Sequence, residues 1–259
     1  MKPLRLLIVD DEAPARARLR DLLGDITAQL PTEVVAEVAD GVSALECIDG
    51  LPPGTVDVVL ADIRMPRMDG IELAQHLARL SHPPAVVFAT AYDQYAVRAF
   101  DLNAVDYLLK PVRAERLAAA LKKARPASLT EAVLRELAPA GRRQLRCSER
   151  GRVLLVPVAE VIYFRADQKY VAARTAEREY LLEESLTHLE AEFAASFLRI
   201  HRNCLVAREA VAGVAREAGA ASEGGDATEA HWALVLRGLP ELLPVSRRQW
   251  PQVKALLGI

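Results

Sequence analysis

The chain has 259 residues, 51% of them hydrophobic and 26% charged, a composition that fits a soluble globular protein and excludes a disordered or fibrous one. The formal net charge of -2 excludes a strongly basic or strongly acidic protein, but the charge is uneven along the chain. Residues 1–140 carry 16 Lys and Arg against 20 Asp and Glu, whereas residues 141–259 carry 17 against 15, which permits an anionic partner for the second half without proving one.

Short apolar segments alternate with helical patterns through the first 110 residues. The strand-like segments are 4–9, 33–38, 56–61, 85–90 and 104–109. Helical spacing of leucines is clear in residues 13–26 and again after Gly70. Regular alternation of this kind, with nearly continuous apolar strands, predicts an α/β domain with a doubly wound, five-stranded parallel sheet covered by helices on both faces. Ligands of such sheets bind at the carboxyl ends of the strands.

Polar side chains stand at the ends of these predicted strands. Asp10 and Asp11 follow the first strand, Asp62 the third, Thr90 ends the fourth and Lys110 follows the fifth. Carboxylates gathered at one sheet edge repel each other, and Mg²⁺, which prefers oxygen ligands, relieves that repulsion. We therefore expect Asp62 to be the nucleophile for a phosphoryl group, whose oxygens the metal and Lys110 would neutralise and Thr90 would hydrogen-bond. Each residue alone would more often be a solvated charge or a turn former, so the interpretation depends on the whole set.

Four stretches of the first half carry a family resemblance: LLIVDDE, VVLADIRMPRMDGIEL, VVFATAY and DYLLKP. They resemble the receiver domain of two-component response regulators, which implies a flavodoxin-like domain over residues 1–124. The resemblance implies that Asp62 accepts its phosphoryl group from a histidine kinase. It also implies that Mg²⁺ is held by Asp11, Asp62 and the backbone carbonyl of Arg64, with Asp10 in the same site.

The resemblance further implies a conformational switch. Thr90 would move toward the phosphate and Tyr107 would turn inward, altering a face through which receivers often form homodimers. From the residues alone, Tyr107 is equally well a half-buried core tyrosine with its hydroxyl in water.

The second half of the chain has a different pattern of predicted elements. After a last helical run at 113–124, residues 125–141 contain Pro126, Pro139 and Gly141 and are interpreted as a linker. Short, closely spaced apolar segments then predict an antiparallel, mostly β domain over 142–259. These segments are QLRCSE, RVLLVPV, EVIYFRA, KYVAART, EREYLL, FLRIH and HWALVLR. Helices are expected at 185–194, with Ser185 as N-cap, and from Ser246 to Leu257.

Polar and basic residues cluster in the predicted loops of this half. They are Gln168 and Lys169 between two strands, Arg202 and Asn203 after FLRIH, and Arg247 and Arg248 at the start of the last helix. Arginine side chains suit guanine edges or phosphates, and loops can enter a DNA groove. From composition alone these would simply be solvated surface residues.

Four stretches give the second half its own resemblance: EVIYFRADQKYVAAR, ESLTHLE, FLRIHRNCLVA and LPVSRR. They resemble the LytTR-type DNA-binding domain of AlgR- and LytR-like regulators. The resemblance implies that Lys169, Arg202 and Arg247 contact double-stranded DNA, with Gln168, Asn203 and Arg248 as further contacts. Two features depart from the family: Ala207 replaces a usual Asn, and the 216–230 loop is longer and more acidic, so we expect it to face away from DNA.

The three cysteines, Cys47, Cys147 and Cys204, have no pairing or metal-ligand spacing, which predicts free thiols in a reducing compartment. The N-terminus lacks a signal-peptide pattern, and no apolar run reaches membrane-spanning length. We therefore expect a cytoplasmic protein without a membrane partner.

The main hypothesis is a transcription regulator, and not an enzyme, in which phosphorylation of Asp62 pairs two receivers and brings two DNA-binding domains together. An enzyme gated by a receiver is the first alternative, although the second half has no G-x-S-x-G, no His/Cys metal cluster and no Gly-rich phosphate loop. An interaction adaptor or an RNA binder is the second, which the few aromatic residues of this half disfavour.

Overall fold

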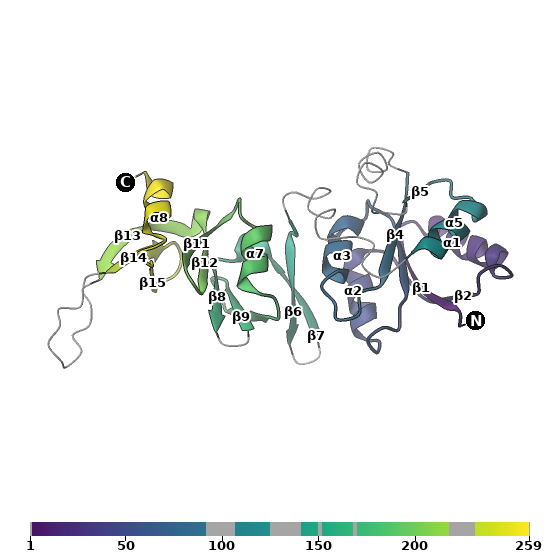
Figure 1. The fold of residues 1–259 in the computed structure, drawn as a ribbon, viewed down its shortest axis with the longest axis horizontal. Coiled ribbons are helices and arrows are strands. Elements are labelled where there is room, and N and C mark those ends of the chain that lie inside the picture. Colours follow the sequence, from purple (N-terminus) through teal and green to yellow (C-terminus); the bar gives the residue numbers. More distant parts are fainter. Residues whose placement is uncertain are drawn as a thin grey trace. The chain divides into compact units, whose positions relative to one another are not determined.

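A computed structural model describes residues 2–91, 107–124, 141–149, 152–167, 170–217 and 231–258. The chain divides into two compact units, Met1–Arg142 and Arg143–Ile259, each with its own sheets and helices (Figure 1). Residues 125–140 of the predicted linker lie outside the described residues. Among the described residues, no helix combines the length and apolar character needed to span a membrane.

The N-terminal unit is built on a parallel five-stranded sheet with the order β2-β1-β3-β4-β5. Its strands are β1 (Leu4–Val9), β2 (Thr32–Val38), β3 (Val58–Ala61), β4 (Ala85–Thr90) and β5 (Tyr107–Leu109). The order reverses beside β1, which is the position where flavodoxin-like sheets bind their ligands. The predicted fold class is confirmed for this unit, although β3 begins two residues later than expected and residues 104–106 are not described.

Four described helices cover this sheet: α1 (Ala13–Ile26), α2 (Gly41–Asp49), α3 (Gly70–Leu77) and α5 (Ala114–Lys123). The leucines of α1 and α5 pack with one set of alternating strand residues, among them Leu6, Ile8 and Leu60, in a single apolar cluster. Helices α2 and α3 pack against each other. Both begin at an aspartate N-cap, because Asp40 accepts a hydrogen bond from the Ser43 amide and Asp69 accepts one from the Glu72 amide.

The C-terminal unit is mostly antiparallel β-structure, as predicted. A hairpin of β6 (Gln144–Glu149) and β7 (Arg152–Pro157) precedes a five-stranded sheet with the order β10-β9-β8-β12-β11 and a three-stranded sheet with the order β13-β14-β15. The five strands are β8 (Tyr163–Asp167), β9 (Tyr170–Arg174), β10 (Glu179–Leu182), β11 (Phe197–His201) and β12 (Cys204–Ala207). The other three are β13 (Val211–Glu217), β14 (His231–Leu236) and β15 (Leu242–Pro244).

Two α-helices complete this unit. Helix α7 (Leu186–Glu192) begins at Ser185, whose side chain accepts a hydrogen bond from the His188 amide, so the predicted N-cap is confirmed. Helix α8 (Trp250–Leu257) begins later than the expected Ser246, and the prediction that Arg247 and Arg248 open a helix is wrong. Proline in the first helical turn, here Pro251, is compatible with a helix that starts at this point.

Strand β8 lies between two apolar cores. Phe164 on one face packs with α7 and with Phe197, its ring centroid 4.8 Å from that ring. Tyr163 on the other face belongs to the core formed by β11, β14 and α8. Its hydroxyl donates a hydrogen bond of 3.1 Å to Glu241, which also pairs with Arg174 at 3.7 Å. Adjacent residues of one strand therefore enter different cores, and Tyr163 packs the five-stranded sheet against the three-stranded one.

The buried hydroxyl of Tyr163 predicts a stability change at alkaline pH. Burial, reinforced by Glu241 and opposed by Arg165, raises the pKa of Tyr163 to about 12, compared with ~10 in an unfolded chain. A raised pKa gives a contribution to stability that is complete below the unfolded pKa and is lost as pH rises through the folded pKa. Wild type should exceed Tyr163→Phe in free energy of unfolding by about 1 kcal/mol at pH 8, and this difference should shrink between about pH 10 and 12.

Urea unfolding at several pH values measures this difference. Tyr170→Phe is the matched control, because Tyr170 is 42% exposed and its replacement removes a phenol hydroxyl without removing one from the core. A constant difference between wild type and Tyr163→Phe up to pH 12 would show that the phenol is not shielded in the way its burial suggests.

Candidate functional site

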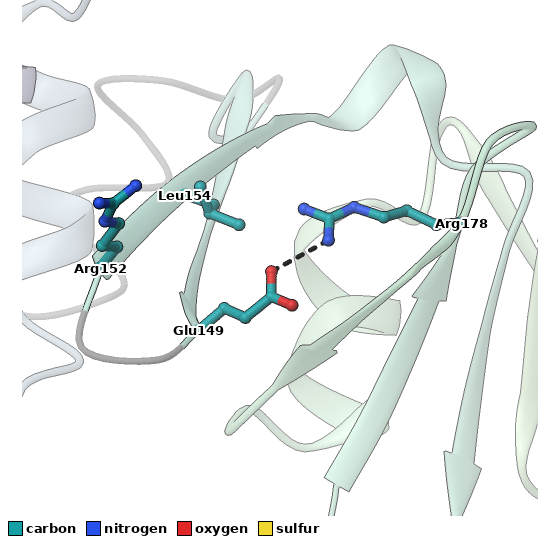
Figure 2. A pocket seen from close by; sticks show the side chains of 4 residues that line it. All are labelled: Glu149, Arg152, Leu154 and Arg178. Atoms are coloured by element: carbon teal, nitrogen blue, oxygen red, sulfur yellow. Dashed lines mark hydrogen bonds and ion pairs between the residues drawn. The ribbon is translucent and has the colours of Figure 1, made fainter.

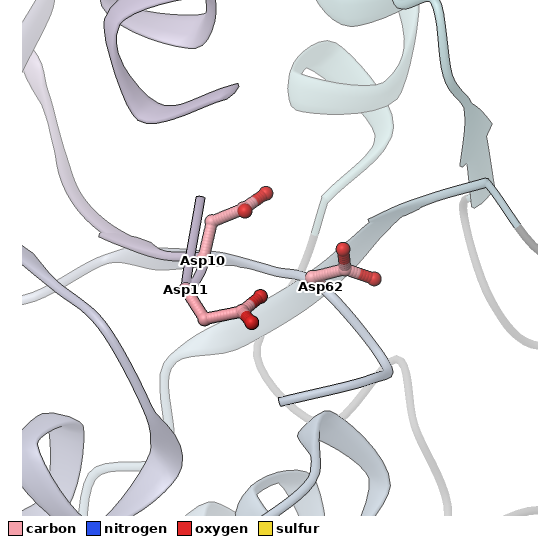
Figure 3. Close-up of side chains that lie close together, drawn as sticks. All are labelled: Asp10, Asp11 and Asp62. Atoms are coloured by element: carbon pink, nitrogen blue, oxygen red, sulfur yellow. The ribbon is translucent and has the colours of Figure 1, made fainter. Parts of the chain in front are cut away.

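Three carboxylates meet at the carboxyl ends of β1 and β3. Asp10 and Asp11 follow β1, Asp62 follows β3, and one oxygen of each lies within 4.8 Å of the others (Figure 3). Asp10 and Asp62 are buried, whereas Asp11 is exposed. Neighbouring parallel strands end at the same edge of a sheet, so residues 52 positions apart in the chain are brought together as the sequence predicted.

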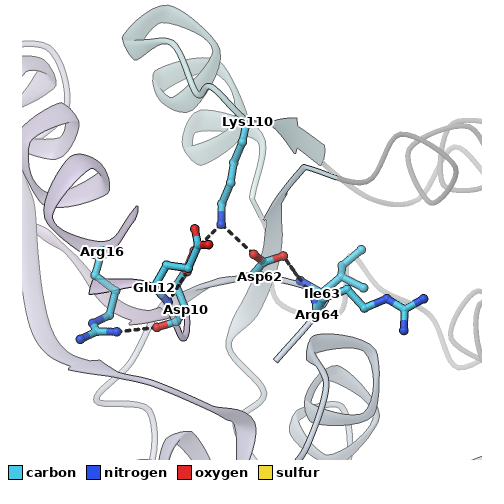
Figure 4. A network of polar contacts seen from close by, with 7 residues as sticks. All are labelled: Asp10, Glu12, Arg16, Asp62, Ile63, Arg64 and Lys110. Atoms are coloured by element: carbon cyan, nitrogen blue, oxygen red, sulfur yellow. Dashed lines mark hydrogen bonds and ion pairs between the residues drawn. The ribbon is translucent and has the colours of Figure 1, made fainter. Parts of the chain in front are cut away.

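Lys110 supplies the opposing charge of this site. Its Nζ lies 2.8 Å from Oδ2 of Asp10 and 2.7 Å from Oδ2 of Asp62, bridging the two buried carboxylates (Figure 4). Burial opposes the charge of the ammonium, but its hydrogen bonds to both aspartates outweigh burial and raise the pKa of Lys110. Burial raises the pKa of Asp10, and Lys110 acts against that shift. Among the described residues that these contacts join, one ammonium meets three carboxylates, so negative charges outnumber positive ones.

Backbone amides fix the orientation of the Asp62 carboxylate. Its Oδ1 accepts hydrogen bonds from the amides of Ile63 at 2.6 Å and Arg64 at 3.3 Å, which leaves Oδ2 for Lys110. Asp10 is held in a similar way, with Oδ1 accepting from the Glu12 amide at 3.1 Å. The two acceptors are therefore preorganised by the chain that surrounds them.

The loop from Asp62 to helix α3 is packed closely against its own strand. The Gly70 amide donates to the Ile63 carbonyl at 2.9 Å, and a Cβ built on Gly70 would lie 2.1 Å from the carbonyl oxygen of Asp62. Arg67, at a φ of 63°, forms an ion pair with Asp40 at the start of α2. This ion pair leaves no signal in the sequence, because its two residues stand 27 positions apart in separate elements.

The two predicted switch residues are both buried. Thr90 is fully buried at the end of β4, and its carbonyl accepts a hydrogen bond of 2.9 Å from the Lys110 amide. Tyr107 is 6% exposed at the start of β5, with its ring centroid 5.7 Å from that of Phe88. Residues 92–106, which connect β4 with β5 and include part of the predicted dimer face, lie outside the described residues.

In the C-terminal unit, the described DNA-contact candidates lie in two turns. Arg202 and Asn203 form the β11–β12 turn, where Arg202 is exposed and Asn203 Oδ1 accepts a 2.5 Å hydrogen bond from His201 Nδ1. Arg247 and Arg248 are exposed in the turn before α8. The Ser246 amide donates to the Ile200 carbonyl at 2.9 Å, which places the second turn beside the end of β11.

Gln168 and Lys169 lie outside the described residues, but the Ala166 amide donates to the Asn203 carbonyl at 2.8 Å, so the end of β8 lies next to the β11–β12 turn. Ala207, where the resembled family usually has Asn, ends β12 away from that turn. Residues 218–230 of the acidic loop are not described.

Comparisons with known proteins agree with the division of the chain into two units. Residues 6–122 match the model of the response regulator receiver domain, and residues 151–258 match the model of the LytTR DNA-binding domain. The chain is 44% identical over 260 residues to a positive alginate biosynthesis regulatory protein of Pseudomonas aeruginosa, covering 98% of this chain and 99% of the relative. It is 35% identical over 256 residues to an uncharacterised response regulatory protein of Yersinia pestis, covering 99% of each. It is 32% identical over 207 residues to the sensory transduction protein LytT of Bacillus subtilis, covering 80% of this chain and 83% of the relative.

The close approach of Gly70 to Asp62 predicts opposite effects of two glycine substitutions. Gly70→Ala places a methyl group against a backbone carbonyl, so it should lower the free energy of unfolding by about 1–3 kcal/mol. Gly24→Ala, within α1 where a Cβ meets nothing within 4 Å, should raise it by up to about 1 kcal/mol. Denaturant unfolding of both variants measures the difference, and a Gly70→Ala variant as stable as wild type would show that the contact is not tight.

Proposed function

We propose, because the chain belongs to the response regulators that join a receiver domain to a LytTR DNA-binding domain, that Asp62 accepts a phosphoryl group from a histidine kinase. The phosphorylated protein then regulates transcription by sequence-specific DNA binding. The observation that carries the proposal is the meeting of Asp62 with Asp10, Asp11 and Lys110 at one sheet edge. In this proposal residues 1–124 form the receiver, 125–141 the linker and 142–259 the DNA-binding domain.

The transfer joins a carboxylate oxygen of Asp62 to phosphorus, while the bond between phosphorus and the kinase histidine breaks. The leaving imidazole nitrogen keeps the electron pair of that bond, and the phosphoryl group carries its negative charge to Asp62. Lys110 already lies 2.7 Å from Asp62 and is placed to neutralise a phosphoryl oxygen. The Thr90 hydroxyl, at the end of β4, is proposed to hydrogen-bond another.

The acidic cluster fits Mg²⁺. Hard divalent cations take carboxylate and carbonyl oxygens, and the three carboxylates exceed the single positive charge of Lys110. We assign the metal to Asp10, Asp11, Asp62 and the backbone carbonyl of Arg64. When bound, the ion would neutralise negative charge on the phosphoryl group.

The switch is proposed to use Thr90 and Tyr107. The Lys110 amide donates a hydrogen bond to the Thr90 carbonyl, so the backbones of the phosphate-facing lysine and the switch threonine are directly joined. A change there would alter the β4–β5 side of the receiver, where two copies form a homodimer. Pairing of receivers would bring two C-terminal domains to adjacent DNA half-sites and raise their effective concentration there.

DNA contact is assigned to the two neighbouring turns of the C-terminal unit. Arg202 and Arg247 project from them with exposed side chains, and the hydrogen bond between Ser246 and Ile200 joins the segments that carry them. The other proposed contacts are Lys169, Gln168, Asn203 and Arg248. The protein acts as a cytoplasmic regulator whose own covalent chemistry is limited to gain and loss of the phosphoryl group at Asp62.

Replacement of Asp62 tests the phosphorylation site. Asp62→Asn should take up no acid-labile phosphate from a small-molecule phosphodonor with Mg²⁺, as measured by intact-protein mass. Asp57→Asn is the control and should be labelled like wild type, because Asp57 lies at the other end of β3 and pairs with Arg5. Phosphate on Asp62→Asn, or its loss from both variants, would contradict the assignment.

Replacement of the two arginines tests the DNA surface. Arg202→Ala and Arg247→Ala should each weaken binding to a site selected from random DNA by about 1–3 kcal/mol, or roughly 5- to 150-fold. Wild-type affinity should fall steeply with salt, because phosphate contacts release counterions. Equilibrium binding titrations at several salt concentrations measure both effects. Wild-type affinity in both variants would reject this surface.

A further inference from the structure

The β11–β12 turn is held by an arginine that does not itself project from the turn. Arg199 Nε donates to the His201 carbonyl at 2.9 Å, and Arg199 Nη2 donates to the Arg202 carbonyl at 2.6 Å. Its Nη1 donates to Glu190 Oε2 on α7 at 2.8 Å. A single guanidinium thus connects two successive carbonyls of the turn to a helix.

The chemistry of arginine explains why this residue type suits the position. The guanidinium is planar and carries five N–H donors in a fixed geometry, so gripping two carbonyls at once defines the orientation of the peptide that joins them. Arg199 has 17% of its side chain exposed, and at least three of its donors are used inside the domain. Arg202, in contrast, is exposed. Arg199 is therefore placed to hold the backbone of the turn, whereas Arg202 is placed to reach outward from it.

The strand pairing is irregular directly before this turn and resumes only at His201 with Cys204, the pair that flanks it. The register of β11 with β12 shifts between Arg199 and His201, so the regular ladder is interrupted directly before the turn. An interrupted ladder leaves the direction of the following residues to other contacts. The Arg199 hydrogen bonds supply such contacts at His201 and Arg202.

We propose that Arg199, anchored by Glu190, is a positioning residue that sets the direction in which Arg202 meets DNA. The inference rests on the proposed function, since it needs Arg202 to be a contact. Bidentate recognition of a base edge depends on the orientation of the arginine, and a loosened turn loses that orientation. Removal of Arg199 should therefore cost specific affinity mainly through Arg202.

A double-mutant cycle in the full chain tests the inference. Arg199→Ala should weaken binding to the selected site by about tenfold in wild type but by less than about twofold in the Arg202→Ala background, because a positioning residue has nothing left to position. In the Arg247→Ala background it should again weaken binding by about tenfold, because Arg247 lies on the other turn. A general structural defect would instead cause the same loss in all three backgrounds.

Two further variants keep the test independent of folding. Glu190→Gln keeps the shape of the side chain, and Arg199→Lys keeps the positive charge but not the planar set of N–H donors, so both variants should fold. Both should show a smaller loss of affinity for the selected site, and this loss should again disappear in the Arg202→Ala background. Arg178→Ala is the charge-matched control. Arg178 pairs with Glu149 at 3.0 Å across a hollow of about 550 Å³ lined also by Arg152 and Leu154 (Figure 2). Its removal should reduce affinity for selected and random DNA equally.

The outcomes separate the inference from the function on which it rests. If Arg202→Ala binds the selected site as tightly as wild type, Arg202 is not a contact and both the assignment of Arg202 and the role of Arg199 are rejected. If Arg202→Ala weakens binding but Arg199→Ala, Arg199→Lys and Glu190→Gln behave like Arg178→Ala, the contact remains and the positioning role is overturned. The positioning role is also overturned if the loss of affinity in the double variant equals the product of the losses in Arg199→Ala and Arg202→Ala.

Discussion

The bridge from Lys110 to Asp10 and Asp62 is the interaction on which the N-terminal unit depends. Two buried carboxylates at a sheet edge would repel each other strongly in a medium of low dielectric constant, and the ammonium between them offsets that repulsion. One positive charge is too little for three carboxylates, so the edge of the sheet stays receptive to a cation. The same imbalance that makes the site costly to fold suits it to bind a divalent cation.

The C-terminal unit uses polar contacts differently, to join pieces that have separate cores. Tyr163 and Phe164 each belong to a different apolar cluster, and Glu241 ties the first of them to β9 through Arg174. The exposed Arg202 and Arg247 directly follow residues that such contacts hold, because His201 accepts a hydrogen bond from Arg199 and Ser246 donates one to Ile200. A rigid framework beneath exposed long side chains limits the conformational entropy lost when they bind.

The sequence predicted those features that depend on strand order and periodicity. Asp10, Asp62 and Lys110 could be placed together because parallel strands end at one edge, and the leucine spacing predicted the bounds of α1. Strands β12, β13 and β15 were not identified separately, since β12 and β15 are short and the apolar residues of β13 are mixed with small and polar ones. The Arg67–Asp40 and Arg199–Glu190 pairs were beyond prediction, because they depend on the tertiary meeting of separate elements.

The hydrogen bonds that Arg199 donates at the β11–β12 turn are accepted by backbone carbonyl oxygens, which every amino acid possesses. These hydrogen bonds therefore do not depend on which side chain occupies position 202. If Arg202 contacts DNA as proposed, a substitution at this position would exchange one recognition group for another while the backbone that presents it stays in place. Descendants of such a protein could diverge in the operators they read through single replacements at one solvent-facing position, with the surrounding scaffold inherited unchanged.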